Sequence, residues 1–233
     1  MGFQFPFSLS WKDYLPFDLS GTGADTTYAP ETGGEVRDIL RLKNGTAVTL
    51  RAAHAGDAER IQQLVRGLSL ESRYHRFFYP LQEVPPDMLA RFTLSDPTGA
   101  MTLLAVIQRD GQEIAIGMAQ YVADPYPVSG EFAVLVADEW HRSGLGTRLI
   151  QTLICVARAA GIMRLQGDVL AENEPMVRLM VSMGFELDTH ADGAYLWKAS
   201  KMLEAPEWNC SPLTILARQA KAGAAQRGRA GVA

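Results

Sequence analysis

Residues 131–147 bring together a carboxylate, an apolar run and a turn with two glycines. Glu131 begins the apolar run, which continues to Val136, and Gly144 and Gly146 stand in the turn. Glycine lets the backbone approach a ligand closely or adopt a positive φ. If a helix begins at this turn, its unpaired N–H groups and the positive end of its dipole form a site for an anion such as pyrophosphate. The turn also supplies donors from Arg142, Ser143 and Thr147.

This turn differs from the common nucleotide-binding loops. It lacks the Gly-x-x-x-x-Gly-Lys-Ser/Thr of a P-loop. Leu149 stands where the third glycine of a dinucleotide-binding Gly-x-Gly-x-x-Gly would fall. An ordinary strand-to-helix turn without a ligand is the alternative that the turn alone leaves open.

The elements that position this turn are predicted from the periodicity of the surrounding sequence. Alternating or continuous apolar residues predict strands at 46–51, 101–108, 113–122, 131–136, 164–170, 185–187 and 195–197. Apolar residues three and four apart predict helices at 57–70, 87–94 and 144–160, and another that Asn173 caps and Gly184 ends. Asp110-Gly111 predicts a hairpin turn. The alternation of strands and helices predicts a mixed α/β domain.

Both ends of the chain differ from this pattern. Residues 1–44 scatter aromatic side chains among prolines and glycines without a period, so we expect an N-terminal arm that packs on its own domain or on a partner, which is compatible with a homodimer. Residues 45–204 form the predicted domain. Residues 205–233 form an alanine-rich tail with four basic residues against one acid. A solvated tail and contact with nucleic acid or an acidic partner are both open for it.

Composition excludes several classes of protein. The chain has 233 residues and a net charge of −4, so we expect no nucleic-acid partner. No apolar run reaches 18 residues, so we expect no membrane partner. Neither the two cysteines, Cys155 and Cys210, nor the four histidines show metal spacing, and we expect no metal. We also expect no disulfide framework, which makes a reducing cytoplasm the simplest location.

Several motifs resemble the GNAT superfamily of acetyltransferases. They are the loop and its preceding strand, together with Asn173-x-x-Met-x-x-Leu-Met-x-x-x-Gly184-Phe185. The resemblance covers about residues 46–199. The segments Ser72-Arg-Tyr-His-Arg-Phe-Phe78, Glu131-Phe-Ala-Val and Asp138-x-Trp-His-x-x-Gly-Leu-Gly146 resemble, more narrowly, the acetyltransferase domain of bacterial Pat-type protein lysine acetyltransferases. The fold implied is a mostly antiparallel twisted sheet, splayed at the cofactor site and flanked by helices.

The resemblance implies that acetyl-CoA is the cosubstrate. Its pantetheine arm would pair with the backbone of Val134, Leu135 and Val136, and Asn173 would face this arm. Its pyrophosphate would lie on the loop formed by His141, Arg142, Ser143, Gly144, Leu145, Gly146 and Thr147. The family prefers Arg or Gln where this chain has His141, which can still donate from its ring or backbone.

Transfer to an amine requires a neutral nitrogen, because a protonated lysine has no lone pair to attack the thioester. Glu131 is therefore our candidate general base, and the resemblance to Pat-type enzymes points to the same residue. The apolar neighbours Tyr121, Tyr126 and Phe132 could raise its pKa. A solvated glutamate at a strand edge is the alternative. The family tyrosine that protonates the CoA thiolate is replaced by Met180, which cannot donate.

The acceptor is the least determined part of the hypothesis. Residues 73–76, Arg-Tyr-His-Arg, fall between the first two predicted helices, a region that often borders the acceptor site in GNAT folds. They could recognise an acidic acceptor or hold the fold. The function we predict is N-acetyl transfer from acetyl-CoA to a primary amine, with a protein lysine favoured. A small-molecule amine acceptor and a non-catalytic acyl-CoA sensor domain are the alternatives.

Overall fold

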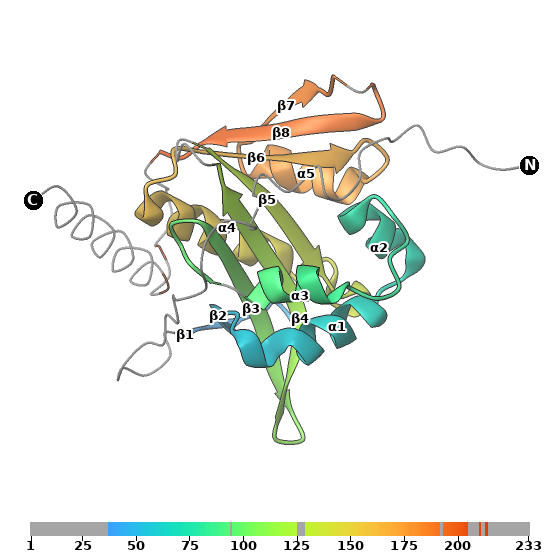
Figure 1. The fold of residues 1–233 in the computed structure, drawn as a ribbon, viewed down its shortest axis with the longest axis vertical. Coiled ribbons are helices and arrows are strands. Elements are labelled where there is room, and N and C mark those ends of the chain that lie inside the picture. Colours follow the sequence, from blue (N-terminus) through green and yellow to red (C-terminus); the bar gives the residue numbers. More distant parts are fainter. Residues whose placement is uncertain are drawn as a thin grey trace, which may run out of the picture. The chain divides into compact units, whose positions relative to one another are not determined.

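The computed structural model describes residues 37–93, 95–124, 129–191, 193–204, 210 and 213. Within this part of the chain the elements follow in the order β1 (Arg37–Arg41), β2 (Ala47–Ala52), η2 (Ala55–Asp57), α1 (Ala58–Arg66), α2 (Leu70–Phe77), α3 (Pro86–Thr93), β3 (Ala100–Arg109), β4 (Gln112–Ala123), β5 (Ser129–Val136), η3 (Asp138–Trp140), α4 (Leu145–Ala160), β6 (Arg164–Leu170), α5 (Glu174–Ser182), β7 (Glu186–Thr189) and β8 (Leu196–Met202). The predicted mixed α/β class is confirmed (Figure 1).

The strands form an eight-stranded sheet in the order β1-β2-β3-β4-β5-β6-β8-β7. Every neighbouring pair is antiparallel except β5 and β6, which are parallel. A parallel pair needs a crossover, and α4 supplies it. In Figure 1, β6, β7 and β8 run across the top of the view, while β3, β4 and β5 run steeply below them.

Each face of the sheet has its own apolar cluster. Leu145, Leu149 and Leu153 of α4 pack on one face together with Met180 of α5. The other face is covered by α1 and α3, whose buried residues include Ile61, Leu64, Val65 and Phe92. The sheet is therefore buried on both sides, as the near-continuous apolar run of β5 indicates.

Three sequence predictions need correction. The sheet begins at β1, within the span assigned to the arm, because Arg37–Arg41 pairs antiparallel with β2. Residues 70–77 form the separate helix α2, although no helix was predicted after Leu70. The helix after the glycine turn begins at Leu145, with Gly144 as its N-cap. Residues 1–36 of the predicted arm lie outside the described part of the chain, and so does most of the predicted tail.

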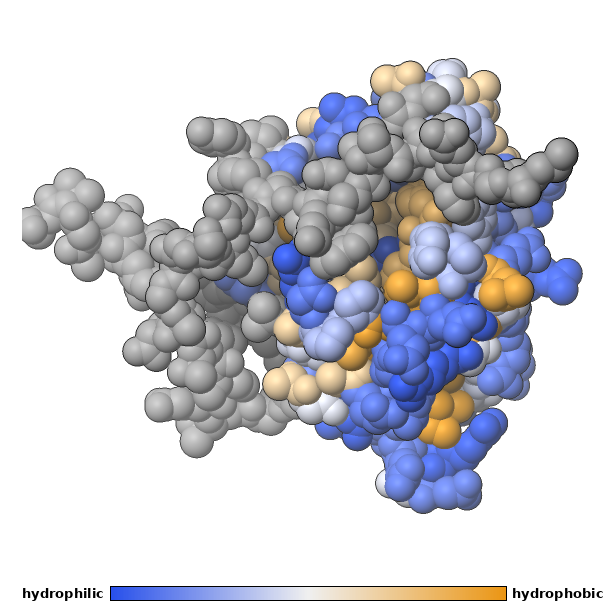
Figure 2. Space-filling model, turned by 45° about the vertical axis from the view of Figure 1, so that its right-hand side comes forward, coloured by the Kyte–Doolittle hydropathy of each residue, from blue (hydrophilic) through white to orange (hydrophobic). Residues whose placement is uncertain are grey.

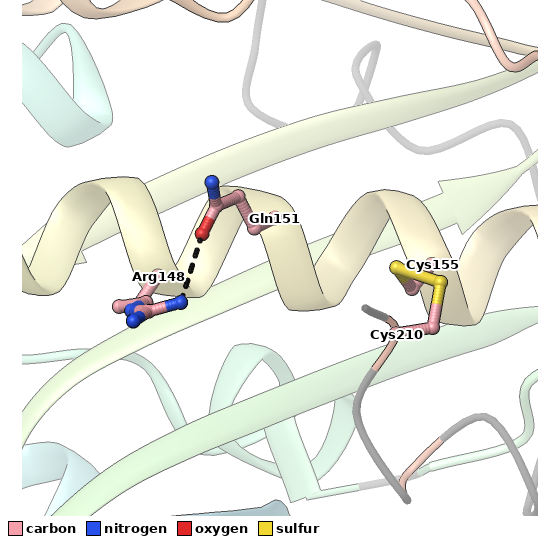
Figure 3. Close-up of a disulfide and its surroundings, with 4 residues drawn as sticks. All are labelled: Arg148, Gln151, Cys155 and Cys210. Atoms are coloured by element: carbon pink, nitrogen blue, oxygen red, sulfur yellow. Dashed lines mark hydrogen bonds between the residues drawn. A yellow bond between two sulfur atoms is a disulfide. The ribbon is translucent and has the colours of Figure 1, made fainter. Parts of the chain in front are cut away.

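The cysteine prediction is wrong. Cys155 of α4 and Cys210 form a disulfide whose Cα atoms are 5.6 Å apart, across a sequence separation of 55 residues (Figure 3). Close by in sequence, Leu213 is fully buried in the apolar cluster that contains α4. The two cysteines lie far apart in the sequence and are brought together by the fold. No short spacing motif could therefore have predicted their pairing.

Candidate active site

Strands β5 and β6 separate in the middle of the sheet. Their parallel register holds for Ser129–Arg164, Gly130–Leu165 and Glu131–Gln166, and it ends there. β6 continues to Leu170 paired on its other side with β8, and β5 continues to Val136 paired on its other side with β4. The sheet is therefore splayed beyond Glu131, which stands at the last paired position of β5.

The backbone of β5 offers hydrogen-bonding groups to this opening. The N–H of Ala137 donates to Ile116 of β4 at 3.0 Å, so the odd-numbered residues of β5 direct their backbone groups toward β4. Val134 and Val136 consequently direct theirs to the side of β6, beyond the end of the β5–β6 ladder. Leu135 directs its backbone to β4, so of the three residues proposed to hold the pantetheine arm only Val134 and Val136 face the opening.

His141 partly occupies this edge. Its Nε2 lies 2.9 Å from the carbonyl oxygen of Val136. The ring therefore donates to β5 when Nε2 carries the proton. His141 thus fastens the loop to the strand, and the amide of Val136 and both backbone groups of Val134 remain directed into the opening.

The loop between β5 and α4 is shaped by positive φ angles at Arg142 (58°) and Gly144 (90°). The side chain of Ser143 accepts from the N–H of Leu145 at 3.3 Å, and its hydroxyl donates to the carbonyl of Trp140 at 2.7 Å. The next two amides, of Gly146 and Thr147, lie in the first turn of α4, where a helix has no acceptor of its own. The turn therefore presents N–H groups and the positive end of a 16-residue helix.

Gly146 lies where α4, α5 and β5 approach one another. A Cβ atom at this position would lie 3.4 Å from Leu179 Cδ2 of α5 and 3.9 Å from Val136 Cγ2. These are ordinary van der Waals distances, so the first turn of α4 packs closely beside α5 and the end of β5.

Glu131 is half-buried, and its environment favours the neutral acid. Burial is the main cause that raises the pKa of Glu131, and the negative charge of Asp168 raises it further. The positive charges of Lys198 and Arg76 act in the opposite direction. Of the apolar neighbours proposed for Glu131, Tyr121 and Phe132 are buried in the core, and Tyr126 lies outside the described residues.

Asn173 caps α5, as predicted: its Oδ1 accepts from the N–H of Met176 at 3.2 Å. This bond uses the oxygen of the side chain and leaves its NH₂ group as a donor. Met180 is fully buried in the core. The nearby Ser182 is exposed and donates to its own helix at the carbonyl of Leu179.

Sequence reasoning placed Arg76 in a segment that borders the acceptor site but did not connect it to Glu131, and it missed Asp168. Arg76 of α2 is an electrostatic neighbour of Glu131, and desolvation lowers the pKa of this guanidinium to about 10. The guanidinium lies 4.9 Å from the ring centre of Phe77 and 5.7 Å from that of Phe92. Asp168 lies on β6 two residues beyond Gln166, the partner of Glu131, and therefore on the same face of the sheet. Only the tertiary fold brings these charges together.

Comparisons with known proteins identify the family. Residues 66–185 match the model of the acetyltransferase (GNAT) family. Acetyltransferase PA5475 of Pseudomonas aeruginosa is 31% identical over 147 residues, which are 63% of this chain and 79% of that protein. The GNAT domain of PAT from S. lividans shares the fold with a TM-score of 0.65 and 25% identity, covering 72% of this chain and 97% of that one.

The structure of yncA from Salmonella typhimurium, which holds its cofactor acetyl-CoA, has the same fold at 19% identity and a TM-score of 0.54. It covers 70% of this chain and 97% of that one. This chain belongs to the GNAT family of acetyltransferases. The splayed strands and the helix terminus described above form the part of the fold that carries its candidate active site.

Two further findings concern other kinds of site. Within the described residues, no helix is both long and apolar enough to cross a membrane. The same part of the chain contains no group of three or more His, Cys, Asp or Glu side chains that could hold a metal ion.

Proposed function

We propose that this chain transfers an acetyl group from acetyl-CoA to a primary amine, with a protein lysine as the favoured acceptor and Glu131 as general base. The observation that carries the proposal is the position of Glu131 at the last paired residue before β5 and β6 separate. The same strand ends at Val136, and the following loop leads to the amides at the start of α4, which begins at Leu145. A carboxylate and an anion-binding helix terminus thus lie at the two ends of one open strand edge.

The residues along this edge fit an acyl-CoA. Val134 and Val136 would bind the amide groups of the pantetheine arm, as an added strand would pair with them. The amides of Gly146 and Thr147, with Arg142 and Ser143, would hold the pyrophosphate. Asn173 can donate to the arm from its NH₂ group. That yncA holds acetyl-CoA in the same fold supports this assignment.

Bound acetyl-CoA would supply a thioester carbonyl that a neutral amine can attack. Glu131 would take a proton from the ammonium form of the acceptor, directly or through water. A raised pKa suits this role, because a carboxylate is a stronger base when its pKa lies closer to the working pH. The buried Met180 offers no proton to the departing thiolate, so we assign no general acid.

The acceptor end of the site is bordered by α2, which carries Arg73, His75 and Arg76. The positive charges of Arg73 and Arg76 disfavour a polyamine, which would need an acidic cleft. They are compatible with a lysine flanked by acidic residues. The similarity to the GNAT domain of PAT supports a protein acceptor, and the small-molecule amine is the alternative.

The test is thiol release from acetyl-CoA by the purified protein, with denatured cell proteins, lysine peptides and small amines as acceptors. Binding of acetyl-CoA is followed in parallel by calorimetry. Turnover with proteins or peptides supports the proposal. Turnover restricted to small amines would move the chain to the metabolite class. Binding without turnover on every acceptor would favour an acyl-CoA sensor, and no binding would contradict the proposal altogether.

A further inference from the structure

Helix α2 is held to the loop side of the site by one carboxylate. Asp138, in the 3-10 turn that follows β5, accepts from the backbone N–H of Ser69 at 2.7 Å and from its hydroxyl at 3.0 Å. Its Oδ1 also accepts from the hydroxyl of Ser72. Ser69 is the N-cap of α2 and accepts in turn from the N–H of Ser72 at 3.1 Å.

Asp138 also belongs to the loop that leads to α4. Its carbonyl accepts from the N–H of His141 at 3.1 Å, and the ring of His141 contacts the carbonyl of Val136. Side chain and backbone of one residue therefore connect α2 to the segment that we propose binds the cofactor. The carboxylate stands at the N-terminus of α2, where a negative charge is favoured by the helix dipole.

Packing at the C-terminal end of α2 supplements this anchor, because Phe77 packs against the apolar cluster that contains α1 and α3. The helix has eight residues, about 12 Å in length at 1.5 Å per residue, and none of its residues is fully buried. Toward its other end Arg76 stacks on Phe77 and Phe92 and is an electrostatic neighbour of Glu131. The helix thus spans the distance from the cofactor loop to the candidate base.

We propose that Asp138 is a positioning residue of the transfer reaction. Through Ser69 and Ser72 it fixes the position of α2 relative to the cofactor loop. It thereby also fixes Arg76 at the acceptor end of the site. This inference rests on the proposed function, because it assigns a role to Asp138 in placing the acceptor amine. Asp138 touches neither reactant in this account, and it acts only through α2.

The environment of Asp138 favours its ionised form. Burial by itself would raise the pKa of Asp138, but the hydrogen bonds from Ser72 and Ser69 and the charge of His141 lower it below its ordinary value. At every pH at which Glu131 is ionised and can act as a base, the carboxylate of Asp138 is therefore also ionised and remains a strong hydrogen-bond acceptor. Its charged or titratable neighbours include His141 on its own loop, the acid Glu139 in the same 3-10 turn and the acid Glu71 on α2.

The kinetic test uses Asp138→Asn, Ser72→Ala and the double variant, with Asp87→Asn as control. Asp87 is an exposed acid in the first turn of the neighbouring helix α3, so its substitution makes the same chemical change without touching α2. We expect Asp138→Asn to lower kcat/KM for a lysine peptide about tenfold, while the Kd for acetyl-CoA stays within about twofold. The double variant should fall no more than about twofold below Asp138→Asn, because both changes remove the same contact.

A general loss of stability would impair both kcat/KM for the lysine peptide and the affinity for acetyl-CoA, and would not lower kcat/KM alone. Unchanged acceptor kinetics in both single variants, additive effects in the double variant, or a parallel loss of acetyl-CoA affinity would each overturn the proposal.

Hydrogen exchange separates this proposal from the proposed function. In Asp138→Asn the amides of residues 70–77 should exchange at least about tenfold faster, while those of β5 and α4 keep their protection. Unchanged exchange in α2 would overturn the role of Asp138 even if the wild-type protein is active. Faster exchange in α2 combined with no turnover by the wild-type protein would have a different meaning. It would show that Asp138 does hold α2, but that the proposed function is wrong and that Asp138 therefore has no role in acetyl transfer.

Discussion

Phe132 and Gly167 face each other where β5 and β6 begin to separate. A Cβ atom added to Gly167 would lie 2.7 Å from the carbonyl oxygen of Phe132 and 3.1 Å from its ring. Both residues stand one position beyond the last paired residues, Glu131 and Gln166. The close approach of a carbonyl to a glycine therefore defines the apex of the opening that we assign to the cofactor.

We expect Gly167→Ala to destabilise the fold by about 1–3 kcal/mol, because a backbone carbonyl must move to admit the methyl group. Urea unfolding measures this change. Gly99→Ala is the control, since the nearest atom to a Cβ there is a side-chain oxygen of Asp96 at 3.8 Å. Equal stability of the two variants would show that β5 and β6 are not in close contact at the apex.

A buried ion-pair network holds the first strands to α1. The guanidinium of Arg51, fully buried, donates to both oxygens of Asp57 at 2.7 Å and to Glu113 at 2.7 Å. Asp57→Ala would leave a buried charge without this partner, and we expect a loss of about 3–5 kcal/mol in the free energy of unfolding. Glu83→Ala breaks the exposed pair with Arg66 and should cost less than about 1 kcal/mol. A loss for Asp57→Ala as small as that for Glu83→Ala would contradict the buried network.

The disulfide between Cys155 and Cys210 should contribute about 2–4 kcal/mol, because it closes a loop of 55 residues in the unfolded chain. Thermal unfolding with and without a reductant measures this contribution. The double variant Cys155→Ser/Cys210→Ser should melt like the reduced protein and should not respond to the reductant. Two free thiols in the untreated, folded protein would disprove the pairing.

The raised pKa of Glu131 predicts a pH-dependent stability. A carboxyl whose pKa is higher in the folded state contributes stability below its unfolded pKa, and this contribution is lost as the pH rises through the folded pKa. Glu131→Gln should therefore be more stable than the wild type at about pH 7.5, and the difference should shrink toward about pH 4. Unfolding by urea across this range tests the sign, with Glu186→Gln, on the exposed part of β7, as the control. A difference that grows as the pH falls would show that the environment stabilises the ionised form.

The sequence predicts the local parts of this structure well. The apolar run from Glu131 to Val136, the two glycines after it and the amphipathic helix that follows are contiguous, so composition and period suffice to place them. The cap at Asn173 is likewise a local interaction, confirmed by its bond to Met176. The motifs that resemble GNAT enzymes lie within these same segments.

Most of the missed features depend on contacts between distant residues. Helix α2 is the exception, because its N-cap Ser69, whose side chain accepts from the N–H of Ser72, is a local signal that was overlooked. Its anchor, Asp138, is 66 residues from Ser72, and Cys155 is 55 residues from Cys210. The backbone of Leu135 faces β4 because of the register in which β5 pairs with β4. A strand predicted from sequence alone has no register, so this direction could not be predicted.

The central claim, that Glu131 is the general base of acetyl transfer, is tested most directly by comparing Glu131→Gln with the wild type. The measurement is kcat with a lysine peptide acceptor, alongside the Kd for acetyl-CoA by calorimetry. We predict a fall in kcat of about 10²–10⁴-fold with a Kd unchanged within about twofold, because the amide of glutamine cannot accept the proton while the backbone groups that bind the cofactor remain. Undiminished turnover by Glu131→Gln would contradict the claim.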